Sequence, residues 1–212
     1  MEKIHEWIVA NIPRNGIVIE AGVCFGEDTE RFSHHLSDGK VYGFEPIQHI
    51  FDVAYRRVGL RQNVELYNLG LSDKEGDFDM FYSDRFGQAW GSSSLRAPKE
   101  HLNFNPEITF KQKLPVKCIN LDSWADSKGI DRVDLLWLDL QGSEPDVLLA
   151  SPRILSKTKY LYSEVSVVEN YDGQTVYSEY KDFLSKHGFK VVEEGLYWAD
   201  GGNVLFENTN LI

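Results

Sequence analysis

Short apolar runs and amphipathic stretches take turns along this chain. The runs at 16–22, 40–46 and 133–140 are mostly apolar, as expected for strands that are buried on both faces. The stretches at 26–36 and 47–59 carry apolar positions at helical spacing and predict amphipathic helices between the strands. Because strands and helices alternate, the pattern predicts an α/β fold whose mostly parallel sheet has helices on both faces.

The same alternation continues to the end of the chain. The further elements are a helix at 2–11, a strand at 63–72, a helix at 144–151, a strand at 159–166, a helix at 175–188 and two strands at 189–194 and 203–208. Gly188 stands at the end of the last helix, where glycine is a favoured cap. The final two strands are expected to close a seven-stranded sheet as an antiparallel pair.

One segment does not follow the alternation. Strand patterns at 77–83 and 113–122 flank a polar stretch at 84–107 that is rich in Gly, Ser, Asn and Pro. Connections of this length in compact domains are usually functional or disordered. We therefore expect an inserted hairpin or lid around 77–119, with a long surface loop in its middle.

Length and charge limit the kind of protein. A chain of 212 residues with 42% hydrophobic content suits a single domain over 1–212, which can itself be one module of a longer chain. The net charge is −11 and basic residues are scattered, so a nucleic-acid partner is not expected. No signal-like start and no long apolar run is present, which predicts a cytoplasmic protein without a membrane partner. The sequence leaves the oligomeric state open.

The turn after the first strand carries the clearest ligand signal. Gly22 and Gly26 lie between strand and helix, where glycines let backbone N–H groups approach a ligand. The spacing lacks the middle glycine of the dinucleotide fingerprint, which argues against an NAD enzyme. Glu20 is expected to favour a ligand with positive charge, and S-adenosylmethionine (SAM) carries an ammonium and a sulfonium. A plain strand–helix turn with a solvated glutamate is the alternative.

Two later strand ends add to this ligand site. Glu45 ends the second strand, at the place where an acidic side chain meets ribose hydroxyls in related sheets. Its alternative role is a cap before Pro46. Gly70, with Leu71 and Ser72, ends the third strand and is expected beside an adenine ring, unless Gly70 simply ends the strand.

These stretches together resemble the FkbM family of SAM-dependent O-methyltransferases, over about 16–208. The family's motifs are matched by Glu20, Gly22, Val23, Gly26 and Thr29, by Phe44-Glu45-Pro46, by "LDSWADSKGIDRVDLLWLDLQGSEPDVLL" at 121–149 and by "YDGQTVYSEYKDFLSKHGF" at 171–189. Val23 and Gln141 depart from the usual alanine and glutamate. The resemblance implies a Rossmann-like class I methyltransferase fold, SAM as cofactor, and Thr29 as part of the cofactor motif.

Two strand-end carboxylates are candidates for the chemistry. Methyl transfer to oxygen requires an aligned hydroxyl and a group that takes its proton. Asp139 ends the fourth strand beside the glycine turn. Its side chain is expected to act as the base, and the alternatives are a cap of the following turn or a contact to the cofactor's amino group. Glu164 ends the fifth strand, as a second base or a substrate ligand. If both converge, they are also candidate ligands for Mg²⁺ or Mn²⁺.

The acceptor is less clearly encoded. Trp90, Ser92, Ser93 and Ser94 resemble a lip that stacks on a sugar and bonds its hydroxyls, unless this is a disordered polar loop. Gln141 is assigned to the same acceptor side. The sequence thus predicts an O-methyltransferase acting on a small molecule or glycan, preferably at a sugar hydroxyl. A polyketide or carboxylate acceptor and a non-catalytic nucleoside-binding module are the alternatives.

Overall fold

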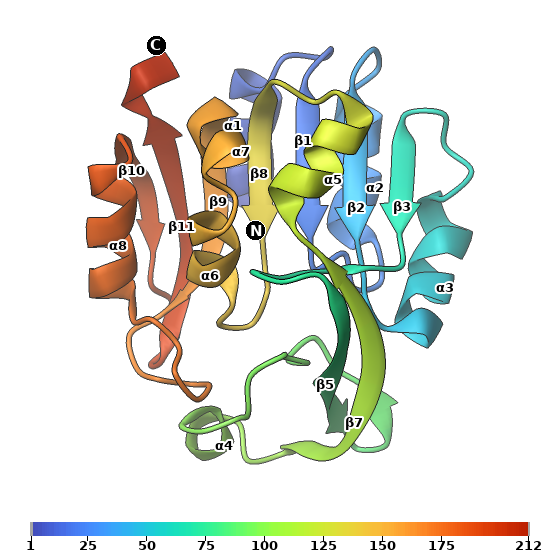
Figure 1. Cartoon of the computed structure of the whole chain (residues 1–212), viewed down its shortest axis with the longest axis vertical. Coiled ribbons are helices and arrows are strands. Elements are labelled where there is room, and N and C mark those ends of the chain that lie inside the picture. Colours follow the sequence, from blue (N-terminus) through green and yellow to red (C-terminus); the bar gives the residue numbers. More distant parts are fainter. Residues whose placement is uncertain (1, 212) are drawn as a thin grey trace.

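A seven-stranded sheet forms the centre of the computed structural model, which describes residues 2–211 (Figure 1). Its strands are β1 (Ile17–Ala21), β2 (Lys40–Phe44), β3 (Val64–Tyr67), β8 (Val133–Leu138), β9 (Thr158–Ser166), β10 (Phe189–Gly195) and β11 (Gly201–Asn208). The order is β10-β11-β9-β8-β1-β2-β3, and β11 runs antiparallel to both neighbours while the other pairs are parallel. The predicted α/β class and the antiparallel C-terminal pair are confirmed.

The strand order reverses at β1. The chain runs outward from β1 through β2 to β3, and later returns through β8, which pairs with the other edge of β1. The connections that follow β1 and β8 therefore leave in opposite directions and open a crevice at the carboxyl ends of these strands. In open α/β sheets, ligands bind in such a crevice.

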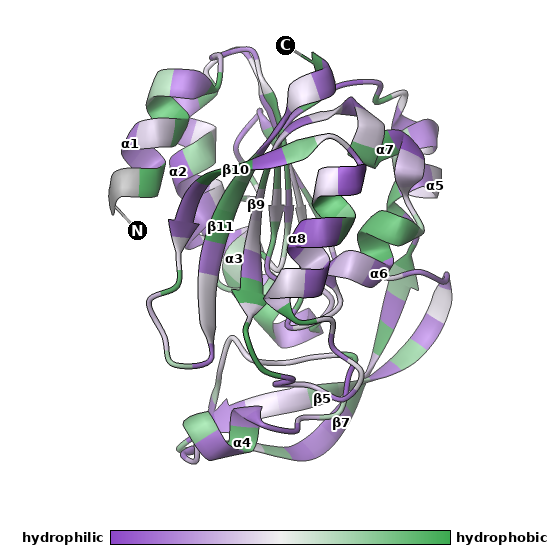
Figure 2. Cartoon of the chain, turned by 90° about the vertical axis from the view of Figure 1, so that its left-hand side faces the viewer, coloured by the Kyte–Doolittle hydropathy of each residue, from purple (hydrophilic) through white to green (hydrophobic). Residues whose placement is uncertain are grey.

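Helices cover both faces of the sheet (Figure 2). One face carries α1 (Glu2–Asn11), α2 (Glu27–His35) and α3 (Gln48–Val58), and the other carries α5 (Leu121–Lys128), α6 (Glu144–Leu149), α7 (Pro152–Lys157) and α8 (Tyr177–Lys186). Each group buries its apolar side chains against the strands and forms its own hydrophobic cluster. Among residues 2–211, no helix has the length and apolar character needed to cross a bilayer.

Aromatic rings hold the middle of the sheet. Every residue of β8 is buried. Trp137 of β8 stacks on Tyr162 of β9 with ring centroids 3.9 Å apart, and Phe32 of α2 meets Trp137 nearly edge-on at 5.2 Å. Offset and edge-to-face pairs of this kind add to the stabilisation from burial. These rings pack on one face of β8, and Leu136 and Leu138 pack into the cluster on the other face, so the strand that leads to Asp139 is packed on both sides.

The predicted insertion is a second, smaller sheet. It contains β4 (Gly70–Leu71), β5 (Gly76–Arg85), β6 (Gln88–Ala89) and β7 (Ile108–Ile119) in the order β4-β7-β5-β6, with the short helix α4 (His101–Phe104) between β6 and β7. The long antiparallel β5–β7 hairpin extends beyond the carboxyl ends of the main strands (Figure 1). The expected hairpin is confirmed, and it lies beside the crevice.

Two predicted boundaries are wrong. The expected third strand at 63–72 is two strands, because Asn68 between them donates to the carbonyls of Glu45 and Pro46 at 3.0 and 3.1 Å and turns the chain out of the main sheet. The expected surface loop at 84–107 is also shorter. Its serine-rich part pairs with β5 through Phe81 and Ser94, which leaves Ser94 buried.

A third boundary is wrong as well, because the strand expected at 113–122 ends at Ile119 and Leu121 begins helix α5; neither α5 nor α7 was expected. Asn120 caps α5 by accepting from the backbone N–H of Ser123 at 3.0 Å, a signal that the sequence does contain. Asp122 has a different partner, since its carboxylate accepts from the backbone N–H groups of Arg153 and Ile154 at 2.9 and 2.8 Å. These N–H groups begin α7, so a side chain of α5 caps α7.

We predict that Asp122→Ala lowers the free energy of unfolding by about 1–2 kcal/mol, because it leaves two N–H groups at the start of α7 without their acceptor. Asp126→Ala is the matched control on the same helix. Asp126 pairs with Arg153 at 2.7 Å through a side chain that is 66% exposed, so its removal should change stability by less than about 0.5 kcal/mol. Urea unfolding measures both, and equal losses would contradict the capping role of Asp122.

Candidate active site

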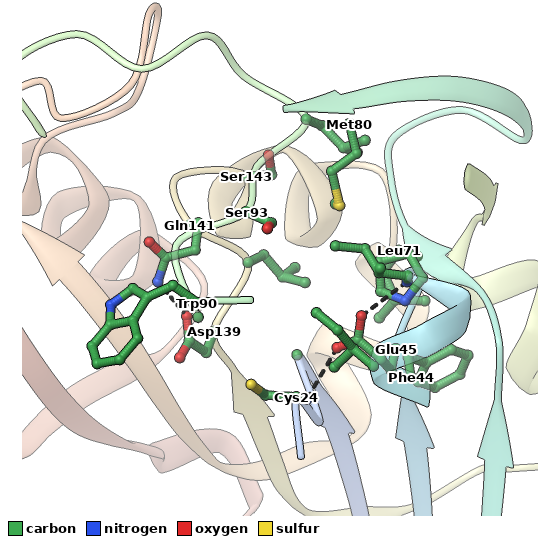
Figure 3. A pocket seen from close by; sticks show the side chains of 18 residues that line it. Cys24, Phe44, Glu45, Leu71, Met80, Trp90, Ser93, Asp139, Gln141 and Ser143 are labelled. Atoms are coloured by element: carbon green, nitrogen blue, oxygen red, sulfur yellow. Dashed lines mark hydrogen bonds between the residues drawn. The ribbon is translucent and has the colours of Figure 1, made fainter. Parts of the chain in front are cut away.

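A pocket opens at the carboxyl ends of the main strands, between them and the inserted sheet (Figure 3). We call it the first pocket. It contains about 780 Å³ of space, which includes open solvent at its mouth. Gly22 follows β1, Glu45 follows β2, and Asp139 follows β8, while Met80 and Trp90 come from the insertion. The strand ends that the sequence singled out therefore do meet in one place.

Gly22 is the point of closest approach between β1 and β8. Its φ is +91°, and a Cβ added there would lie 2.1 Å from the carbonyl oxygen of Asp139. Its N–H donates to the carbonyl of Phe44 at 3.0 Å, which ties the turn to β2. A side chain at this position is excluded by both conformation and space, so the backbone itself lines the first pocket.

Glu20, Gly26 and Thr29 do not line the first pocket. Glu20 is fully buried behind the turn, accepts the hydroxyl of Thr29 at 2.6 Å, and has a pKa well above its usual value because burial disfavours the charged form. A Cβ at Gly26 would lie 3.4 Å from Ala54 of α3. In this structure these three residues shape the turn from behind, and a contact between Glu20 and the ligand stays a prediction.

Glu45 faces the first pocket and also fixes its shape. One carboxylate oxygen accepts from the backbone N–H of Cys24 at 3.0 Å, and the other from that of Ile47 at 2.9 Å. Burial raises the pKa of Glu45 to about 7. Each oxygen has a second lone pair, so the carboxylate can still accept hydrogen bonds from a ligand.

Of the three residues expected beside the adenine ring, two line the first pocket. Gly70 and Leu71 line the first pocket together with Phe44 and Ile47, which gives this side an apolar surface. Ser72 does not line it, because its buried hydroxyl donates to Asp73 at 3.1 Å. An apolar surface next to Glu45 matches a ligand that combines an aromatic ring with ribose hydroxyls.

Asp139 and Glu164 are brought together through one amide. The side-chain nitrogen of Gln141 donates to Asp139 Oδ1 at 2.7 Å and also to Glu164 Oε2. Burial raises the pKa of Asp139, while burial and then the negative charge of Asp139 raise that of Glu164 well above its usual value. Two carboxylates this close share protons, so they titrate as a pair rather than separately.

Gln141 is held in place from three sides. Its backbone is left-handed with φ of +50°, an uncommon conformation for a residue other than glycine. Its carbonyl accepts the hydroxyl of Ser94 at 2.7 Å, and its side-chain oxygen lies 2.6 Å from the hydroxyl of Tyr171. The amide between the two carboxylates is therefore positioned by the surrounding fold.

The residues present do not fit the metal site that the sequence left open. Among residues 2–211, no group of three or more His, Cys, Asp or Glu side chains gathers to hold an ion. The space between Asp139 and Glu164 is bridged by the hydrogen-bond donor of Gln141 rather than by a further oxygen ligand. Mg²⁺ and Mn²⁺ prefer several oxygens, so we derive no step through a metal.

A second pocket adjoins the first, and Trp90 and Gln141 line both. Glu164 and Ser92 line only the second, and Ser93 lines only the first. Ser94 lines neither. The predicted acceptor residues are thus divided, with Trp90 and Gln141 at the junction and Ser94 supporting Gln141 from outside.

Sequence reasoning missed most of the second pocket. The residues concerned come from α4, from the segment after β9 and from the β10–β11 turn, and they include His101, Asn170, Tyr171, Gln174, Trp198 and Asp200. Tyr171 and Gln174 belong to the "YDGQ" stretch of the family resemblance, so a signal for them existed without an assigned role. The other positions converge only through the fold.

Solved structures show the same fold at low sequence identity. A fibrillarin pre-rRNA processing protein of Methanococcus jannaschii has a TM-score of 0.57 at 14% identity, covering 93% of this chain and 68% of that one. A methyltransferase of Streptococcus mutans solved in complex with SAH has a TM-score of 0.52 at 16% identity, covering 97% and 96%. The methyltransferase FkbM of Methylobacillus flagellatus has a TM-score of 0.54 at 12% identity, covering 92% and 44%.

Sequence comparison identifies the family. The 2-O-methyltransferase NoeI of Sinorhizobium fredii is 30% identical over 99% of this chain and 86% of its own length. The methyltransferase sdnD of Sordaria araneosa is 24% identical over 92% and 82%. The model of the methyltransferase FkbM domain matches residues 10–191. The chain belongs to the FkbM family of methyltransferases.

Proposed function

We propose that this protein transfers the methyl group of SAM to a hydroxyl oxygen of a sugar. One observation carries the proposal: a carboxylate pair lies at the junction of two pockets, with Asp139 lining the first and Glu164 the second. A transfer between two molecules requires two adjoining sites and a proton acceptor between them. The two adjoining pockets supply the sites, and the carboxylate pair supplies the proton acceptor.

The first pocket suits SAM as its occupant. Gly22 lets the backbone come close to a ligand, Glu45 has free lone pairs for ribose hydroxyls, and Leu71 contributes to an apolar surface for the adenine. SAM carries a sulfonium and an ammonium, so a pocket without cationic side chains suits it. No lysine or arginine lines the pocket in the part of the chain that the structure describes.

Residues of this chain can accept the proton that the acceptor hydroxyl loses. When bound, SAM supplies a methyl group on a sulfonium, and its transfer to a hydroxyl leaves a neutral thioether and releases the hydroxyl proton. Asp139 lines the first pocket and accepts that proton on its carboxylate. Glu164 lies across the Gln141 amide and can hold a proton for the pair, which limits repulsion between the two acids.

The second pocket supports a sugar acceptor, and one relative supports transfer to oxygen. Trp90 and Trp198 offer ring faces on which a sugar can stack, and Asn170 and Gln174 offer hydrogen-bonding groups. The relative NoeI is named a 2-O-methyltransferase, which agrees with transfer to oxygen.

We predict that Glu45→Gln weakens SAM binding by about tenfold or more, because it removes the charged acceptor of ribose hydroxyls and of two backbone N–H groups. Turnover at saturating SAM should remain near normal, since these contacts are the same in ground and transition states. Glu65→Gln is the matched control, because Glu65 lies in the neighbouring strand β3 and does not line the pocket. Calorimetric titration and initial rates test this; a turnover defect that persists at saturation would refute it.

Asp139→Asn should lower turnover by about a hundredfold or more while SAM affinity changes little, because the amide keeps the size but cannot accept the proton. Asp131→Asn, an exposed change before the opposite end of the same strand, is the control. Single-turnover rates and calorimetry separate the two effects. If Asp139→Asn chiefly raises the dissociation constant of SAM, Asp139 holds the cofactor instead.

Turnover should rise with pH along a titration whose apparent pKa is above the usual carboxyl value of about 4. Burial raises the pKa of both Asp139 and Glu164, so the form that can accept a proton is lost as pH falls through those raised values. Because Glu45 has a pKa of about 7, rates are measured at saturating SAM and repeated in Glu45→Gln, which should keep the same rise. A flat profile from acidic to neutral pH would exclude the carboxylate pair as the base.

A further inference from the structure

The second pocket has aromatic walls from three separate parts of the chain. Phe104 of α4 is 41% exposed, and Trp198 in the β10–β11 turn is 51% exposed. Trp90 lies at the junction with the first pocket, and the guanidinium of Arg85 covers one of its faces at 4.6 Å. Trp198 therefore offers the more open ring. Exposed aromatic rings around a polar pocket match a ligand that has both apolar faces and polar edges.

Two buried polar side chains in this pocket are incompletely satisfied. Asn170 donates to Asp200 at 2.9 Å and to Ser166 at 3.2 Å, but its side-chain oxygen has no partner. Nδ1 of His101 is also buried without a partner. Both residues line the pocket and are more than nine-tenths buried. A buried polar atom without a hydrogen bond is destabilising, so a hydrogen bond from a ligand hydroxyl or a water to either atom would be favourable.

The charges around the pocket have one sign. Glu144, Glu164 and Asp200 line it, and no lysine or arginine among residues 2–211 does. Burial lowers the pKa of His101, which favours its neutral form. Three cations from the inserted segment are already paired, namely Arg85 with Glu107, Arg96 with Asp146 and Lys99 with Glu169. A negatively charged ligand would find no partner here and would be repelled.

From these observations we infer that the second pocket is the acceptor site and that it binds a hydroxyl-rich ring without negative charge. The ring stacks on Trp198, and its hydroxyls form hydrogen bonds with Asn170, His101 and Asp200. The inference rests on the proposed function, and it adds the place of binding and a selection by charge. A neutral sugar has hydroxyls that both donate and accept, as these groups require. Acidic sugars, sugar phosphates and carboxylate acceptors are disfavoured, because the pocket offers them carboxyl groups and, among the described residues, no lysine or arginine.

The test compares matched pairs of sugars that differ in charge. The probes are the methyl glycosides of glucose, galactose and mannose and those of the three corresponding uronic acids. Binding is followed by saturation-transfer NMR with the protein saturated with S-adenosylhomocysteine, the demethylated product of SAM. At least one neutral probe should bind, and its uronic acid counterpart should bind about tenfold more weakly or not at all. Equal binding within the pairs, or no binding of any neutral probe, overturns the inference.

Two variants locate the binding. Trp198→Ala should weaken binding of the neutral probe by about tenfold. Tyr197→Ala should leave binding unchanged, because Tyr197 is 71% exposed in the same turn and does not line the pocket. Asp200→Asn keeps an acceptor oxygen for Asn170 but removes a charge, so it should reduce the discrimination against the uronic acid. An unchanged affinity in Trp198→Ala contradicts the assignment of this pocket.

Calorimetry with SAM keeps the two proposals separate. If SAM does not bind to the wild-type protein, the proposed function fails. If SAM binds equally to wild type, Trp198→Ala and Asp200→Asn while the sugar results fail, only the acceptor assignment fails.

Discussion

The contact on which the site depends is the backbone approach between the ends of β1 and β8. The N–H of Asp139 donates to the carbonyl of Ala21 at 2.9 Å, and the next residue, Gly22, leaves no room for a Cβ. This contact brings the turn that lines the first pocket next to the carboxylate of Asp139, which lines the same pocket. It also fixes the direction of Asp139, because β8 is buried along its whole length and cannot shift without disturbing the aromatic core.

A second constraint is the placement of like charges. Asp139 and Glu164 would repel one another if both were ionised, and their burial makes this repulsion stronger than it would be in water. The amide of Gln141 gives each a hydrogen bond, and Tyr171 and Ser94 hold that amide in position. The pair is thus kept together by neutral groups, and no cation is needed to explain its geometry. A neutral amide suits this position because a glutamate would add a third acid.

The sequence predicted which strand ends meet, but it did not determine the direction in which each side chain points. The strand pattern and the reversal of order place Gly22, Glu45 and Asp139 at one edge of the sheet, and the first pocket contains all three. Glu20 is one residue before the end of β1, and its side chain lies behind the turn with Thr29, a direction that spacing alone did not settle. Asp122 belongs to a family motif and still has a structural role, because it caps α7. The second pocket could not be predicted, since α4, Asn170 and Trp198 meet only after the insertion and the β10–β11 turn have folded beside each other.

The two pockets differ in the kind of structure that builds them. The first lies mainly on the ends of buried parallel strands, where most substitutions would disturb the core. The second takes its outer wall from a short helix in an insertion and from the tip of a hairpin, both of which are solvent-exposed and tolerate change in length and sequence. If the second pocket holds the acceptor, as we propose, exchanging these two surface segments should change the acceptor while the first pocket stays intact. The same division offers a route for engineering, in which the tip of the β10–β11 hairpin is grafted without touching the main sheet.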